Sequence, residues 1–389
     1  MAEATQTTTG GRSSAAEFLR KVSVDRISAY DMWRDAQGIP VHRGYYVDDV
    51  RTVEVGRWEA RDCNAAFLQL VGAEGVTEAR VTEILPGKSM APLKFALDEI
   101  VYVADGRGLT TVWPSDGGEP RTFEWQKHSL FCLPRNRQHQ ISNAQGGQPA
   151  RLLHYNYLPI SMTIVPDPSF YFDNPYTNPD LMAVNEGEFY SEAKVITVEE
   201  QPGEPSSRFG RMAFWLGNFF PDMRAWDRLV PFRGRGAGGH VVWIRFPGST
   251  VYDHMSVFPA RTYKKAHRHG PGVVIVIPSG EGYSVMWEEG KEKVIVPWHE
   301  GSVFVPPNMW FHQHFNLGAD PARYLAFHAP AVLGVTDERI RDIERDQIEY
   351  PKEDASVRQR FEGELAKRNL TTLMPDQAYK QLGYEWDYD

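Results

Sequence analysis

Three histidines in the C-terminal half have a spacing that suits a metal ion. His267 and His269 lie two residues apart in KKAHRHGPG, and His312 begins HQHFN further along the chain. Alternate residues of a β-strand face the same side, so both imidazoles of the first pair can point into one interior. Imidazole binds iron, nickel, copper and zinc, and three protein ligands leave positions open for water or substrate. The spacing predicts a three-histidine metal site.

An internal repeat indicates which elements position these histidines. VYVADGRGLTTVW in the N-terminal half resembles IVIPSGEGYSVMW in the C-terminal half, at an offset of 174 positions (101 against 275). Two further matches follow in the same order. The matching pairs are 101–113 with 275–287, 123–143 with 296–316, and 149–155 with 321–328. The chain therefore contains two copies of one structural unit.

Each copy has the pattern of antiparallel β-structure. Short β-branched or aromatic runs are interrupted about every ten residues by turn sequences such as DGRG, PSGEG and NLGAD. This spacing favours a sandwich or barrel over alternating strands and helices. We expect an all-β fold with two small barrels, at residues 55–165 and 238–332.

The remaining segments differ in composition. Residues 1–54 read as an N-terminal arm and helix, and 166–237 as a connecting segment rich in Pro, Asn and Asp. Residues 333–389 have a helical period in TDERIRDIERDQIEY and ASVRQRFEGELAKR, with charge all round and few apolar positions. We expect these to be surface helices or oligomer contacts.

The N-terminal copy lacks two of the three histidines. Leu93 and Phe95 stand at the places of the His-x-His pair, and only His139 and Glu99 occupy ligand-like positions. One imidazole and one carboxylate beside two apolar side chains make a poor metal site. We expect the N-terminal barrel to be structural and to bind no metal.

The repeat also helps to choose the third ligand. His314 shares strand parity with His312 and is the alternative. The counterpart of His312 is His139, whereas the counterpart of His314 is Ile141, so we favour His312. Val273 stands where the other copy has its glutamate, and no fourth carboxylate ligand is expected. Three neutral imidazoles leave a metal its full positive charge, which favours an anionic substrate.

Composition excludes several classes of function. The 389 residues are 42% hydrophobic and carry a formal net charge of −9, with a pI near 5.8. An acidic protein is unsuited to nucleic acid. Only two cysteines occur, which is typical of the reducing cytosol. Neither an apolar leader nor an apolar run of about 18 residues is found, so we expect a cytoplasmic protein without membrane contact.

The histidine runs resemble the two motifs of the cupin superfamily. The first covers 259–282, with HRH in the ligand positions, and the second covers 301–316, GSVFVPPNMWFHQHFN. The chain is similar to gentisate and hydroxynaphthoate-type ring-cleaving dioxygenases, which are bicupins that use three histidines, Fe(II) and O₂. The resemblance implies Fe(II) (alternatives Mn, Ni or Zn) on the triad, O₂ as co-substrate and a homo-oligomer. Those enzymes carry their iron in the first cupin, whereas here it would lie in the second.

Three functions are open at this point. The first is a mononuclear Fe(II) dioxygenase that cleaves a C–C bond in a small anionic aromatic or enolisable substrate. The second is a non-oxidative metal-dependent lyase, isomerase or decarboxylase, and the third is a ligand-binding cupin without catalysis. We expect His314, Arg323 and Tyr263 to be catalytic. Further candidates for the pocket are Gln313, Arg261, Trp287 and His254, while His299 is expected to be exposed in a turn.

Overall fold

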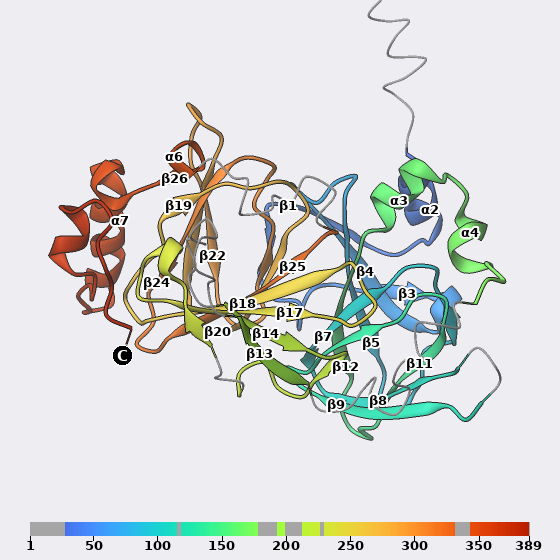
Figure 1. Ribbon diagram of the computed structural model, residues 1–389. Helices are drawn as coiled ribbons and strands as arrows, with labels where there is room; N and C mark the ends of the chain where they lie inside the picture. The colour runs from blue at the N-terminus through green and yellow to red at the C-terminus, as the bar shows by residue number, and fades with distance from the viewer. Residues whose placement is uncertain are drawn as a thin grey trace, which may run out of the picture.

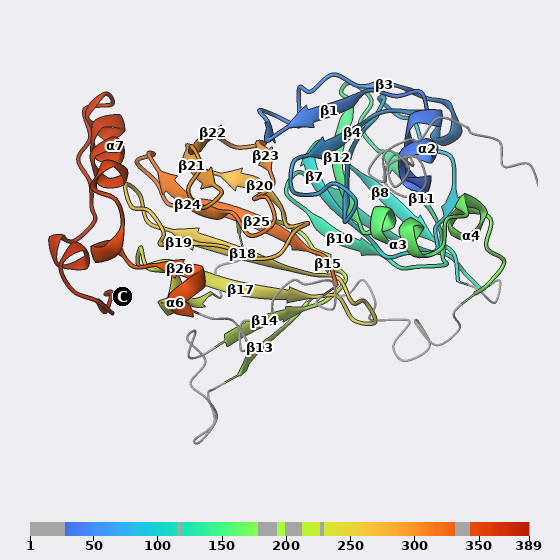
Figure 2. The same ribbon diagram turned by 90° about the horizontal axis from the view of Figure 1, so that it is seen from above.

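Two β-barrels lie side by side and carry short helical segments at their outer ends. The computed structural model describes residues 28–114, 118–177, 193–198, 212–225, 229–330 and 343–388. The N-terminal barrel, blue to teal in Figure 1, adjoins the C-terminal barrel, yellow to orange, and Figure 2 shows the same arrangement from above. The expected all-β architecture of two barrels is confirmed.

The N-terminal barrel consists of a large and a small sheet. The large sheet has the order β1-β4-β5-β12-β7-β10-β15, with β3 added beside β4, and the small sheet has the order β6-β11-β8-β9. The strands of the large sheet are β1 (Val41–Gly44), β3 (Gly56–Trp58), β4 (Cys63–Leu70), β5 (Glu78–Ile84), β7 (Glu99–Asp105), β10 (Leu130–Leu133), β12 (Ala150–Asn156) and β15 (Phe219–Phe220). Those of the small sheet are β6 (Leu93–Lys94), β8 (Arg107–Val112), β9 (Arg121–Gln126) and β11 (Gln138–Asn143).

The C-terminal barrel repeats this plan. Its large sheet has the order β13-β14-β17-β18-β25-β20-β23-β2, with β16 beside β17, and its small sheet has the order β22-β21-β24-β19-β26. The large sheet contains β2 (Tyr46–Val47), β13 (Lys194–Val198), β14 (Met212–Leu216), β16 (Val230–Pro231), β17 (His240–Arg245), β18 (Tyr252–Phe258), β20 (Val274–Ser279), β23 (Val303–Phe304) and β25 (Ala322–His328). The small sheet contains β19 (Ala266–His267), β21 (Gly282–Trp287), β22 (Val294–Trp298), β24 (Phe311–Asn316) and β26 (Gln347–Ile348).

The large sheets face each other, and this explains their apolar sequences. β7 is buried at six successive residues and β12 at nearly all, because each has one face on its own barrel and the other on the neighbouring barrel. The largest buried cluster includes Leu153, Tyr155, Leu325 and Phe327, so it combines both barrels. Tyr155 stacks on Phe327 with ring centroids 5.4 Å apart.

Exchanged strands also join the barrels. β2, from the N-terminal segment, pairs with β23 of the C-terminal barrel, and β15 pairs with β10 of the N-terminal barrel. The segment 166–237, expected as a connection, thus supplies strands to both barrels. β13 and β14 form an antiparallel pair that extends the C-terminal large sheet.

Helices α2 (Ala29–Ala36), α3 (Leu158–Ile164) and α4 (Pro168–Phe172) gather at the outer end of the N-terminal barrel (Figure 1). Ser28 begins α2 as its N-cap, because its side-chain oxygen accepts from the Asp31 backbone N–H at 3.0 Å. Short 3₁₀ turns, η2 (Glu59–Arg61) and η3 (Arg233–Arg235), precede the first long strand of each barrel. Within the described residues, none of the helices is both apolar and long enough to span a membrane.

The C-terminal extension packs on the outer face of the second barrel. It contains α6 (Ile343–Asp346), β26, η5 (Tyr350–Lys352), α7 (Ala355–Ala366) and η6 (Asp376–Tyr379). We expected a helix over residues 336–350. This expectation was wrong at the C-terminal end of the segment, where β26 pairs with β19. Residues 336–342 lie outside the described part of the chain. In α7, Val357, Phe361 and Leu365 recur every fourth residue and form a narrow buried stripe.

Candidate metal centre

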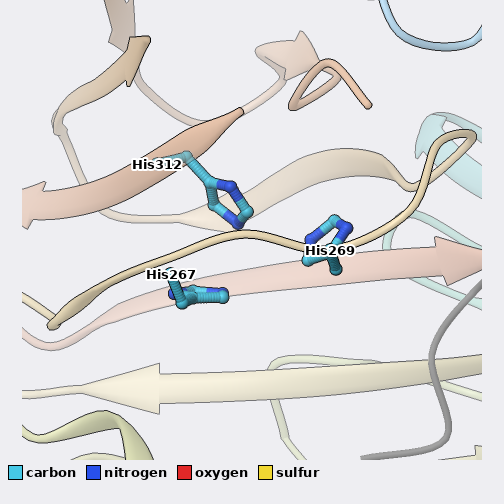
Figure 3. Close-up of side chains that lie close together, drawn as sticks. All are labelled: His267, His269 and His312. Atoms are coloured by element: carbon cyan, nitrogen blue, oxygen red, sulfur yellow. The ribbon is translucent and has the colours of Figure 1, made fainter. Parts of the chain in front are cut away.

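His267 and His312 face each other across two paired strands. β19 pairs with β24 so that these residues are direct partners in the register. His269 lies two positions beyond His267, and its carbonyl oxygen accepts from the Met309 N–H at 2.9 Å, which holds the loop against the start of β24. One ring nitrogen from each histidine lies within 4.8 Å of the other two. Figure 3 shows the three rings directed toward one another.

Backbone hydrogen bonds fix the imidazole tautomers. Nδ1 of His267 lies 3.2 Å from the Lys265 carbonyl oxygen, Nδ1 of His269 lies 2.8 Å from that of Gly270, and Nδ1 of His312 lies 3.2 Å from that of Trp310. A carbonyl oxygen only accepts, so each Nδ1 must carry the proton. Each Nε2 therefore presents a lone pair, as expected of histidines that ligate a metal and are oriented by a second hydrogen bond.

Burial favours the neutral form of His312. His312 is 1% exposed and His267 is 6% exposed, while His269 is partly exposed. Burial lowers the pKa of His312 well below its ordinary value, with further lowering by the neighbouring His269 and His314. Among the described residues, no carboxylate belongs to the cluster. The expected counterpart position, Val273, is a buried side chain of the apolar core. The donor set fits a divalent metal that tolerates three imidazoles.

His314 lies near the triad but outside it. Its ring centroid is 5.5 Å from that of His312 and 6.4 Å from that of His267. Nδ1 of His314 is hydrogen-bonded to Ser284 Oγ at 2.8 Å, and Ser284 also accepts from the indole N–H of Trp298. Burial, followed by the charge of Lys264, lowers the pKa of His314 to about 3. This residue is a neutral neighbour of the triad in the barrel interior.

Two of the residues expected to be catalytic lie on other faces. The Tyr263 ring stacks on Phe315 at 4.7 Å within the cluster beneath the C-terminal extension, and its hydroxyl donates to Glu353. Arg323 alternates along β25 with Ala322 and Tyr324, whose side chains belong to the barrel core, so its own side chain points to the opposite face. The structure brings neither residue to the triad, because both have the outward parity of their strands.

Of the other candidates, Gln313, Arg261 and Trp287 lie apart from the triad, whereas His254 faces the barrel interior, with its ring centroid 5.6 Å from that of Tyr324. Gln313 donates to Glu353 Oε2 at 3.1 Å, on the outward face of β24. Arg261 occupies a turn with φ of 57°, and Trp287 stacks on Phe311 at 5.6 Å. His254 is held by the imidazole of His328, with Nδ1 and Nε2 2.8 Å apart, rather than by the backbone. The side chain of His299 is 44% exposed, as expected for a turn residue.

The N-terminal barrel has the same register without the ligands. His139 pairs with Leu93 as His312 pairs with His267, which confirms the alignment of the repeats. Phe95 is buried against Phe172, with stacked rings 5.4 Å apart. Glu99 lies 2.6 Å from Arg80 and 2.9 Å from His154, so its oxygens are already occupied by a guanidinium and by an imidazole whose pKa is lowered by burial. Within the described residues the three-histidine group is the one cluster found that could hold a metal.

The sequence analysis missed two buried basic side chains near the triad, one of which, Lys264, has its pKa lowered well below the ordinary value by burial. Lys264 is 0% exposed; its ammonium lies 5.1 Å from the Tyr324 ring centroid and donates to Ser256. Arg235 donates from Nη1 to Gln347 Oε1 at 2.8 Å, and Gln347 is the strand partner of His267. The internal repeat could have identified Arg235, because RGRG aligns with EARD at the offset of 174 and places Arg235 opposite Arg61. Lys264 had no comparable signal, since its inward direction follows from the bend after Arg261.

Comparisons with known proteins give structural likeness only. A scan against protein-family models finds no match, and a search of curated proteins also finds none. A mutant of Bacillus subtilis oxalate decarboxylase aligns with a TM-score of 0.50 and 14% identity over 88% of this chain and 87% of that chain. The Mn(II)-containing enzyme from the same organism aligns with a TM-score of 0.46 and 14% identity over 73% and 76%. A formate complex of Lactobacillus farciminis oxalate decarboxylase gives 0.46 and 13% over 74% and 86%.

This level of identity does not confirm the narrower resemblance to ring-cleaving dioxygenases. The alignment that covers 88% of this chain spans both barrels, and it agrees with the internal repeat and with the sheet order of each barrel. By sequence repeat, by sheet topology and by likeness to solved structures, the chain has the fold of a bicupin.

Proposed function

We propose that this protein is a mononuclear metal-dependent enzyme that acts on a small anionic substrate in its C-terminal barrel. The observation that carries the proposal is the set of three Nε2 atoms on one face of a buried barrel interior, each with its tautomer fixed by a backbone carbonyl. Three imidazoles turned toward one another, each oriented by a hydrogen bond from its second ring nitrogen to the backbone, form the arrangement that metal-ligating histidines adopt.

The proposed metal is Fe(II), and the proposed reaction is O₂-dependent cleavage of a C–C bond in an aromatic or enolisable anion. When bound, iron would supply open coordination positions and the redox chemistry that O₂ requires. The chain's part is to hold the three imidazoles neutral, exclude water and orient the substrate. The absence of a carboxylate from the described cluster supports this assignment, since the ligands cancel none of the metal's charge.

Arg235 would add to the attraction for an anion, whereas burial and the charge of Arg235 lower the pKa of Lys264 well below its ordinary value and so weaken its positive charge. Both are buried near the triad, and the charge of Arg235 contributes to the lowered pKa of His312, after burial and the neighbouring histidines. Arg235 is the better anchor for a carboxylate, because its planar guanidinium presents paired donors. We propose that Arg235 orients the substrate. We also propose that His314 is the imidazole nearest to the substrate apart from those of the triad.

A non-oxidative lyase or decarboxylase is the second candidate. The buried Arg235 also favours it, because fixed positive charge in a buried site stabilises a developing carbanion or enolate without O₂. Manganese or zinc would then suffice, as Lewis acids. The oxalate decarboxylases share the fold, and their reaction is one member of this class.

Metal analysis tests the first step of the proposal. Purified protein is expected to contain close to one transition metal per chain, and His267→Ala or His269→Ala to lose it. His299→Ala is the matched control, since this exposed histidine of the same barrel should not affect metal content. Undiminished metal in folded His267→Ala would contradict the assignment of the ligands.

Oxygen dependence separates the two candidate reactions. The iron form should consume one O₂ per substrate turned over from a panel of catechols, gentisates and β-diketones, without nicotinamide, flavin or 2-oxoglutarate. The zinc form should be inactive, because zinc has no redox chemistry. Equal turnover by the zinc form under strict anaerobiosis would replace the dioxygenase by the lyase.

A further inference from the structure

The N-terminal barrel contains a cavity where its twin has the triad. Its volume is about 360 Å³, within the range of cavities that hold small organic molecules. Leu93 and Phe95, which replace His267 and His269, both line it, together with Glu99. Residues of α2 and α4 complete the wall. The barrel without metal ligands therefore has a cavity at the position that corresponds to the triad of the other barrel.

The walls of this cavity are aromatic and flat. Trp33 of α2 stacks on Phe172 of α4 with ring centroids 4.9 Å apart, and Phe172 stacks on Phe95 at 5.4 Å. Trp58 also lines the space, and its indole N–H is already bound to Gln37 Oε1 at 3.0 Å. Such surfaces suit a planar ring, which gains both apolar burial and stacking.

Among the charged groups around the cavity, which include the exposed Asp173, Arg61 is the guanidinium without a direct ion pair in the described residues. Arg80 is paired with both Glu78 and Glu99, and Glu99 is also bound to His154. Arg61 lines the cavity and is 5% exposed. Its Nη1 donates to the Ala91 carbonyl oxygen at 2.6 Å, and among the described residues it has no ion pair. The Arg61 guanidinium interacts with Glu99 without a direct ion pair, so its direct ion-pair position is open to the carboxylate of a ligand.

The repeat places Arg61 at the position of Arg235. Each ends a 3₁₀ turn before the first long strand of its barrel. The Arg61 carbonyl oxygen accepts from the Ala91 N–H at 2.8 Å, as the Arg235 carbonyl oxygen does from the Lys265 N–H at 3.0 Å. Both barrels thus direct an arginine from the same element toward their interior.

His139 provides a second unsatisfied group at this place. It is the strand partner of the cavity residue Leu93 and is 2% exposed. Its Nδ1 is used by the Arg137 carbonyl oxygen at 3.3 Å, and within the described residues its Nε2 has no hydrogen-bond partner. A buried polar atom without a partner points to a ligand or water that would satisfy it.

We propose that this cavity is a metal-free binding site for an aromatic carboxylate. The carboxylate pairs with the Arg61 guanidinium, and the ring lies among Trp33, Phe95 and Phe172. The site is independent of the proposed metal centre in the other barrel, and the chain thereby has two ligand sites of different chemistry on one repeated framework.

Calorimetric titration with benzoate and its neutral isostere benzamide tests the proposal. The titrations use His267→Ala protein, so that a metal in the second barrel takes no part. Benzoate is expected to bind one equivalent per chain, about ten- to hundredfold more tightly than benzamide, since a hydrogen bond to a charged group is the difference. Adding Arg61→Gln should make the two affinities equal. Adding Arg57→Gln, an exposed arginine that precedes the same turn, should change neither.

The ratio of the two affinities distinguishes loss of the anchor from misfolding, which would abolish binding of both compounds. An unchanged benzoate-to-benzamide ratio in the Arg61→Gln protein would overturn the proposal. So would the absence of saturable benzoate binding from His267→Ala protein when the unsubstituted protein binds it, because the ligand would then sit at the metal centre. Saturable binding of neither benzoate nor naphthoate to either protein would overturn it as well.

Discussion

Glu353 should make the stability of this protein depend on pH in an unusual direction. This carboxylate joins the C-terminal extension to the second barrel, where it accepts hydrogen bonds from the Tyr263 hydroxyl and from Gln313 Nε2. Burial raises its pKa from 4.5 to about 7, against the lowering effect of those two donors. Gln313 lies between His312 and His314 on β24, so the contact also braces the strand that carries the proposed ligand.

The sign follows from proton linkage. Between pH 4.5 and about 7 the folded protein holds a proton on Glu353 that the unfolded chain has released. Stability from this group is therefore greatest at low pH and falls as pH rises through that window, after which it is constant. Each pKa unit is worth about 1.4 kcal/mol, so the full fall is about 3 kcal/mol. Partial exposure of the side chain reduces this to about 2 kcal/mol.

Glu353→Gln removes the titration while keeping the shape of the side chain. The difference in unfolding free energy between the variant and the unsubstituted protein should be near zero at pH 5 and should favour the variant by about 2 kcal/mol at pH 8. Guanidinium denaturation followed by tryptophan fluorescence at four pH values measures it. Glu385→Gln, at an exposed position of the same extension, is the control and should give a flat difference. A flat difference for Glu353→Gln, or one that falls with pH, would refute the reasoning.

Two further predictions concern the degenerate barrel and the assembly. His139→Ala should leave metal content unchanged and should cost about 1–2 kcal/mol in stability, because a buried imidazole with one backbone hydrogen bond is removed; loss of metal from the folded variant would mean that the wrong barrel was chosen. The protein is expected to be a homo-oligomer, and a sedimenting species of about the 44.3 kDa chain mass at micromolar concentration would contradict this.

The sequence predicted the two barrels and the histidine cluster for the same reason. The repeat fixes the register, and the pairing of His139 with Leu93 reproduces that of His312 with His267. The repeat, however, does not show which face of a strand is covered by a segment that lies outside the repeated units. Tyr263 was expected in the pocket, but it turns outward because α7 supplies an apolar stripe that needs a partner.

The charged appearance of the last segment concealed that stripe. Only three residues of α7, Val357, Phe361 and Leu365, are buried, and they are spaced by four among charged neighbours. A stripe so narrow is sufficient because the barrel face below it is aromatic, with Phe361 lying 5.0 Å from the Tyr263 ring. The exchanged strands β2 and β15 were likewise beyond prediction, since two residues are too few for a β-pattern and their partners are remote in sequence.

The two interiors differ in how positive charge is placed, and this difference connects the proposed sites. In the first barrel Glu99 is balanced by Arg80 and His154, so no carboxylate remains to hold a metal. In the second barrel the counterpart of Glu99 is Val273, and the imidazoles bring no charge of their own. Each barrel also contains a buried arginine at the equivalent position, Arg61 in the first and Arg235 in the second. A metal bound in the second interior would make it still more positive, whereas in the first interior Arg80 is ion-paired and Arg61 has no direct ion pair among the described residues. Under the two proposals, an anion would react beside a metal in the second interior and would only be bound in the first.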